Sequence, residues 1–137
     1  MRLETLKWLE DIRLAGEAVM QFAAGRSLSN YAGDLQLRSA VERQLGIAGE
    51  ALIQLRRGDP ETAARISDYE QVIAFRHHLV HRYWDIRAEV VWNIIQRDVP
   101  VLIREVRGLL AEGDAALADP PPSQPQHLDP APPQEPP

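Results

Sequence analysis

The chain of 137 residues contains no cysteine, and none of its apolar runs is long enough to cross a membrane. The lack of cysteine excludes a disulfide framework and a cysteine-based zinc site. A membrane-spanning helix needs about 20 predominantly apolar residues, and the N-terminus also lacks the apolar core of a secretory signal. We therefore expect a soluble, cytoplasmic protein.

An excess of positive charge is also missing. The formal net charge is −5, and it becomes about −2 once the three acidic residues near the C-terminus, Asp119, Asp129 and Glu135, are set aside. The overall charge therefore does not mark a nucleic-acid-binding protein. An anionic partner would have to be bound by a local patch of positive charge.

The C-terminal end is poor in apolar residues. Nine prolines and neither lysine nor arginine occur between Asp119 and Pro137. Such a segment has too few apolar side chains to offset the entropy lost on ordering, so we expect a disordered, Pro-rich tail. We place the domain boundary so that residues 1–113 form the folded domain and residues 114–137 form the tail, to which we assign no role.

Strand-like alternation and internal repeats are absent, and apolar side chains instead recur every three or four residues, as in amphipathic helices. The spacing predicts a first helix over residues 3–24, which ends before Gly25, and a loop or short irregular turn over residues 26–33. It predicts a second helix over residues 34–57. The apolar stripes consist of Trp8, Ile12, Ala15, Val19 and Phe22 in the first helix, and of Leu37, Val41, Leu45, Ala48, Leu52 and Leu55 in the second.

Three further helices are predicted, over residues 61–66, 69–80 and 85–113. The expected N-terminal caps are Asp59, followed by Pro60 at the first helical position, then Ser67 or Asp68, and finally Asp85. Pro100 interrupts the last helix and should kink it, because proline removes one backbone hydrogen bond. The short connections predict an all-α fold, an antiparallel bundle of four to five helices.

Titratable side chains gather in one stretch, from Phe75 to Tyr83. This stretch holds three of the four histidines, together with two arginines and a tyrosine. One interpretation is a metal site, since His77 and His81 are four residues apart and would share a helix face. Zinc needs at least one further ligand, and neither an H-E-x-x-H pattern nor a nearby pair of carboxylates supplies it.

A second interpretation is structural. Histidine and arginine interact favourably with the C-terminal end of a helix, and Tyr83 and Trp84 could belong to the core.

A third interpretation is RNA cleavage by the substrate's own 2′-hydroxyl, without a metal. That reaction needs a group that moves a proton near neutral pH, which suits histidine, and a cation for the charge on phosphorus, which suits the planar fork of arginine. Arg76 and His81 are five residues apart, which places them about 140° apart around an ideal helix. They converge only if the helix ends between them or if a second subunit completes the site.

The arginine, the histidine and the following tyrosine form an R-x4-H-x-Y pattern at Arg76, His81 and Tyr83. This pattern resembles the motif of the HepT-like toxins of the HEPN superfamily, and the similarity extends over roughly residues 3–112. The other similar blocks are Ala40-Val41-Glu42-Arg43, Ile47-Ala48-Gly49-Glu50-Ala51, Leu79-Val80-His81-Arg82-Tyr83, Val91-Trp92 and Asp98-Val99-Pro100.

The resemblance implies a HEPN-type helical domain that acts as a metal-independent ribonuclease without a cofactor. It implies that two subunits pair so that their motifs face each other across one cleft. It also implies a partner, a small nucleotidyltransferase antitoxin that silences the toxin by attaching AMP to the motif tyrosine. Arg76 would then bind and polarise the phosphate, His81 would transfer a proton, and Tyr83 would accept the AMP.

Other residues near the motif have less specific expectations. The family most often has asparagine at the position of His77, which is still polar and could assist the site. Glu50 is either the partner of a motif arginine or histidine, or an exposed surface residue. His78 is expected to be solvated or to cap the helix, Trp92 to belong to the core or to a dimer contact, and His127 to have no role.

Two alternatives to the toxin remain open from the sequence. The first is a catalytically silent HEPN module that only binds a nucleotidyltransferase, and the second is a histidine metal site on a helical bundle.

Overall fold

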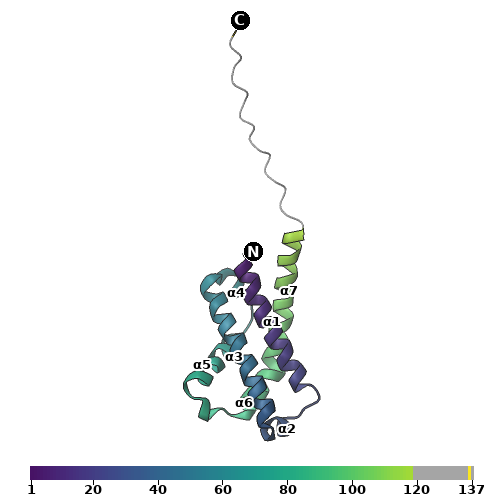
Figure 1. The fold of residues 1–137 in the computed structure, drawn as a ribbon, viewed down its shortest axis with the longest axis vertical. Helices are drawn as coiled ribbons and strands as arrows, with labels where there is room; N and C mark the ends of the chain where they lie inside the picture. The colour runs from purple at the N-terminus through teal and green to yellow at the C-terminus, as the bar shows by residue number, and fades with distance from the viewer. Residues whose placement is uncertain (119–135, 137) are drawn as a thin grey trace.

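The computed structural model describes residues 1–118 and residue 136, and every regular element within them is helical. This confirms the predicted all-α bundle (Figure 1). The helices are α1 (Leu3–Ala23), α2 (Leu28–Gly33), α3 (Leu35–Gly58), α4 (Pro60–Ala63), α5 (Glu70–His81), α6 (Ala88–Asn93) and α7 (Val99–Ala118). A 3-10 turn, η1 (Tyr83–Asp85), follows α5, and a π-helical turn, η2 (Ile94–Asp98), joins α6 to α7.

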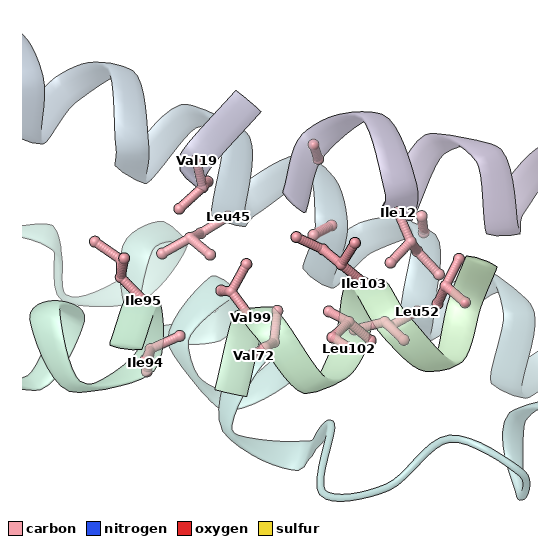
Figure 2. Packing of buried hydrophobic residues seen from close by; sticks show 14 of the residues in the cluster. Ile12, Val19, Leu45, Leu52, Val72, Ile94, Ile95, Val99, Leu102 and Ile103 are labelled. Atoms are coloured by element: carbon pink, nitrogen blue, oxygen red, sulfur yellow. The ribbon is translucent and has the colours of Figure 1, made fainter. Parts of the chain in front are cut away.

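The centre of the bundle is formed by three long helices, because α1 packs against both α3 and α7. The apolar stripes predicted from the sequence supply this core, and Figure 2 shows their side chains meeting between the helices. Ile12, Leu45 and Ile95, from three different segments, are at most 1% exposed. Of the predicted first stripe, Trp8 is only partly buried and Phe22 is exposed, because they lie at the edge of the buried face.

The ends of α3 are held by aspartates. Asp34 caps the helix and accepts a hydrogen bond from the backbone N–H of Leu37, so α3 begins at Leu35. Asp59 caps α4 as predicted, accepting from the backbone N–H and the hydroxyl of Thr62. It also accepts a 2.8 Å hydrogen bond from the Thr5 hydroxyl, which ties the start of α1 to this corner.

The helix α5 lies on the flank of α3 (Figure 1). It buries only Val72 and Phe75 fully, so its remaining faces are open to solvent or half-buried. The predicted caps Ser67 and Asp68 were wrong. The residue that precedes the helix is Tyr69, whose side chain makes no capping hydrogen bond, and Asp68 instead turns the chain with a positive φ of 47°.

The segment after α5 differs from the sequence prediction. Asp85 does not cap a long helix but lies in η1, and α6 starts only at Ala88. The predicted irregularity at Pro100 is present as the π turn η2, in which the Val99 N–H bonds to the carbonyl of Ile94, five residues earlier. Proline has no N–H to offer, which favours such a change of hydrogen-bond pattern just before it.

Two boundaries were also missed. Residues 26–33, predicted as a loop or short irregular turn, contain the six-residue helix α2. The last helix continues through Gly113 to Ala118, so residues 114–118 are helical rather than part of a tail. The remainder of the predicted tail, with His127, lies outside the described residues, apart from Pro136. Among the helices described, none is long and apolar enough to cross a membrane.

Candidate functional site

The R-x4-H-x-Y residues lie on the last two turns of α5 and on η1. The helix is regular from Glu70 to His81 and ends there, one residue beyond the predicted end at residue 80. The end falls after His81 and not between the two motif residues. Arg76 and His81 therefore remain about 140° apart around the helix axis within one protomer.

Arg76 lies against α3 at a point of very close helix approach. A Cβ built on Gly49 would come within 2.5 Å of the Cβ of Arg76 and within 3.1 Å of the Val72 carbonyl oxygen, so only glycine allows this spacing. The Arg76 guanidinium forms a 2.7 Å ion pair with Glu50, whose other carboxylate oxygen accepts from Gln54 at 3.0 Å. Glu50 thus pairs with the motif arginine and is not a bare surface residue.

The two histidines of the cluster lie together on an outer face of α5. The ring centroids of His77 and His81 are 4.3 Å apart, and both side chains are exposed. In the part of the chain that the structure describes, no group of three or more histidine, aspartate or glutamate side chains converges as metal ligands. The arrangement does leave two imidazoles accessible to a substrate.

The turn η1 projects its aromatic residues into solvent. Tyr83 and Trp84 are each 70% exposed, so the interpretation that placed them in the core is wrong. His78 has its Nε2 atom 3.1 Å from the carbonyl oxygen of Asp85, which ties the end of α5 to this turn. Trp92, by contrast, packs against the core, and its ring centroid lies 5.6 Å from that of Tyr31. This agrees with the first of the two predictions for Trp92, that it belongs to the core.

Arg76 borders a groove of about 490 Å³ between α3 and α5. Its lining consists of Ser39, Glu42, Arg43, Gly46, Ile47, Glu50, Arg76, Leu79 and Val80. Burial raises the pKa of the Glu42 carboxyl here, although Arg38 partly opposes the shift. The apolar periodicity of the sequence does not indicate this groove, although the seven-residue spacing of Arg43 and Glu50 does indicate a shared helix face.

A second cavity of about 470 Å³ lies between α5, η1 and α6. Its lining is mixed, with apolar side chains such as Phe75, Ile86 and Val90 beside the polar groups of His78, Asp85 and Arg87. The end of α5 is therefore flanked by two concave surfaces, one on each side of the motif.

Comparisons with known proteins identify the family of the chain. The family model described as Ribonuclease HepT-like matches residues 12–109. A protein named "Putative RNase TTE0752" from Caldanaerobacter subterraneus subsp. tengcongensis is 26% identical over 103 residues, covering 75% of this chain and 91% of that protein. "Probable ribonuclease HepT" from Thermococcus cleftensis is 29% identical over 99 residues, covering 69% of this chain and 86% of that protein. No solved structure matches the chain significantly.

The matched region runs from α1 into α7 and contains every residue of the groove and of the R-x4-H-x-Y motif. This chain therefore belongs to the HepT-like ribonuclease family.

Proposed function

We propose that this protein is a metal-independent endoribonuclease and the toxin of a toxin–antitoxin pair, in which Arg76 and His81 carry out the reaction. The observation that carries the proposal is the end of α5, where a half-buried arginine and an exposed histidine pair flank an open surface. Family membership supports RNA as the substrate.

The reaction assigned to the site is attack of an RNA 2′-hydroxyl on the adjacent phosphorus. The P–O5′ bond breaks, leaving a 2′,3′-cyclic phosphate and a 5′-hydroxyl. The Arg76 guanidinium binds two phosphate oxygens and stabilises the charge that builds up on them. His81 transfers a proton during the attack or the departure of the 5′ oxygen, and the neighbouring His77 supports it at a ring separation of 4.3 Å.

Glu50 has a positioning role in this proposal. Its carboxylate holds the guanidinium of Arg76 through a 2.7 Å ion pair. The side chain of Arg76 is 32% exposed and that of Glu50 is 45% exposed. An arginine side chain has many rotamers, so a partner that restricts them keeps the guanidinium ready for the phosphate.

A second protomer completes the site in our proposal. Because α5 is a continuous helix, Arg76 and His81 of one chain do not face the same direction, and a phosphate cannot contact both along that helix face. Val80 lies between them around the helix and is 57% exposed, beside a groove that also contains Ile47 and Leu79, so this face presents apolar side chains to solvent. We propose that a second copy packs on this face and brings Arg76 of one protomer to His81 of the other.

Regulation by AMP at Tyr83 is the last part of the proposal. The side chain is 70% exposed on η1, so its hydroxyl is accessible to a modifying enzyme. A nucleotidyltransferase antitoxin would join the Tyr83 oxygen to the α-phosphorus of ATP, releasing pyrophosphate and the phenol proton. The AMP would then add bulk and negative charge two residues after His81, where RNA phosphates must approach.

One assay tests the catalytic proposal. Purified protein is incubated with RNA, with and without a chelator, beside Arg76→Ala and His81→Ala. We expect chelator-resistant cleavage with 2′,3′-cyclic phosphate ends, and a loss of about 100-fold or more in both variants. Cleavage that stops on chelation would favour a metal enzyme, and an inactive, unmodified wild-type protein would favour a module that only binds its partner.

The modification is tested by mass spectrometry after co-expression with the nucleotidyltransferase partner. We expect one added AMP on the wild-type protein and none on Tyr83→Phe. The matched control is Tyr69→Phe, which should still be modified. Addition of AMP to Tyr83→Phe would contradict the assignment of the acceptor.

A further inference from the structure

The exposure of Trp84 is not explained by the reaction proposed above. The other two tryptophans, Trp8 and Trp92, are partly buried and pack against the core, whereas Trp84 is 70% exposed beside the equally exposed Tyr83. A tryptophan in this position leaves a large apolar ring in water, and such rings on a surface typically mark a binding site.

The two aromatic rings are held in a defined arrangement. Their centroids are 5.5 Å apart and their planes are inclined by 82°, an edge-to-face pair. The turn that carries them is closed by a 3.0 Å hydrogen bond from the Asp85 N–H to the Arg82 carbonyl, and His78 contacts the Asp85 carbonyl. The backbone of a short turn fixed in this way has little conformational freedom to lose on binding.

Two arginines flank the aromatic pair along the chain, with the acidic Asp85 between them. Arg82 directly precedes it, with a side chain that is 63% exposed and lies 3.7 Å from Asp85, and Arg87 follows it at an exposed position on the rim of the second cavity. Exposed aromatic rings with arginines beside them match the chemistry of single-stranded RNA, in which bases stack on rings and phosphates pair with cations.

The position along the chain also suits an RNA strand bound for cleavage. Trp84 is three residues after His81, so their Cα atoms are at most about 10 Å apart. A base next to the phosphate at His81 lies within that reach, because neighbouring nucleotides are separated by only about 3.4 Å when stacked and more when extended.

We propose that Trp84 is a stacking platform for a base flanking the scissile phosphate of single-stranded RNA, with Arg82 and Arg87 binding the neighbouring phosphates. The inference rests on the proposed ribonuclease function, because it takes the phosphate at His81 as its reference point. It assigns to η1 the binding of substrate, separately from the chemistry at Arg76 and His81.

The test measures binding without cleavage. The probe is a fluorescent single-stranded RNA with 2′-O-methyl riboses, which lacks the attacking hydroxyl, and its Kd is measured by anisotropy with the full chain. Trp84→Ala and Trp84→Leu should each weaken binding by roughly 10-fold, whereas Trp84→Phe, which keeps an aromatic ring, should stay within about threefold. Leu14→Ala, at an exposed apolar position on α1 away from this turn, serves as the matched control and should bind like the wild type.

Two results would overturn the inference. One is an unchanged Kd for Trp84→Ala. The other is a Trp84→Ala protein that sediments at a lower mass than the wild type, which would make Trp84 a contact between two copies of the chain. The binding result is independent of catalysis: RNA binding that depends on Trp84 in a protein that cuts no RNA would refute the proposed function, and with it the position beside a scissile phosphate, but would retain Trp84 as a base-stacking residue.

Discussion

Two regions of the molecule differ in the kind of side chain they contain and in how deeply it is buried. One is the core between α1, α3 and α7, and the other is the segment from Arg76 to Arg87. In the core, apolar side chains from three helices are almost completely buried, and the cluster they form contains no charged residue. In the segment, histidines, arginines and aromatic rings are largely exposed, and few apolar side chains hold it in place. The core therefore accounts for stability, and the segment is available for chemistry. Substitutions in the two regions should affect different measurements.

The largest effect on stability is expected in the core. Leu52 on α3 is 0% exposed, so Leu52→Ala leaves a cavity and should lower the free energy of unfolding by about 2–5 kcal/mol. Leu14→Ala, at a leucine of α1 that is 52% exposed, should change it by no more than about 0.5 kcal/mol. Denaturant unfolding of both variants measures the difference. Equal effects would show that Leu52 does not belong to the core that supports the fold.

Gly49 joins the two regions, and its substitution should affect both measurements. The Cβ of Gly49→Ala would meet Arg76 and the backbone of Val72, so α5 must move away from α3. We expect a loss of about 1–3 kcal/mol from overpacking and a clear fall in RNA cleavage, because Arg76 shifts.

The matched control for Gly49 is Gly46, one turn earlier on α3. A Cβ at Gly46 would meet only the Leu79 side chain, at an ordinary 3.6 Å. Gly46→Ala should therefore stabilise the helix by up to about 1 kcal/mol. Thermal melts and cleavage rates of both variants test the distinction. Full activity in Gly49→Ala would mean that the spacing of the two helices does not set the position of Arg76.

The smallest effect is expected at Glu42, which borders the groove. Burial raises the pKa of its carboxyl in the folded protein, so the folded state favours the neutral form. The free energy of unfolding of the wild-type protein therefore falls as the pH rises through the folded pKa. Glu42→Gln is neutral throughout and should raise the melting temperature at pH 7 by no more than about 3 °C, an effect that solvent screening limits. The gain should vanish below about pH 4, where the wild-type carboxyl is protonated in both states. A gain of the same size at pH 3.5 and pH 7 would contradict this account.

The bundle could be predicted from the sequence because burial imposes a helical period on its apolar residues. Leu37, Leu45 and Leu52 recur at turns of one helix and are all buried, as the spacing indicated. The helix α2 was missed because six residues are too short for a period. Its signal was the capping box, in which Ser27 and Asn30 exchange side-chain-to-backbone hydrogen bonds.

The ends of other elements could not be predicted because tertiary contacts decide them. Gly113 suggested a helix end, but α7 runs on past it, and the glycine is buried against Leu6 of α1. The π turn before Pro100 depends on how the chain re-forms its hydrogen bonds around the proline, which the sequence shows only as an interruption.

The candidate site was only partly predictable. The motif residues and the possible Glu50–Arg76 pair follow from sequence pattern and charge. The groove beside Val80 and the exposure of Trp84 depend on how α5 lies on α3, which no periodicity of α5 alone reveals.

The central claim is that one chain carries half of a site, and mixing two inactive proteins tests it most directly. Arg76→Ala retains His81, and His81→Ala retains Arg76, so a mixed dimer would contain one intact Arg76–His81 pair across the interface. The two variants are unfolded and refolded together, and RNA cleavage is compared with that of each variant alone.

We expect the mixture to recover about a quarter of wild-type activity, because half of the dimers are mixed and each holds one of two sites. No recovery, with mixed dimers demonstrated by mass, would contradict a site shared between protomers.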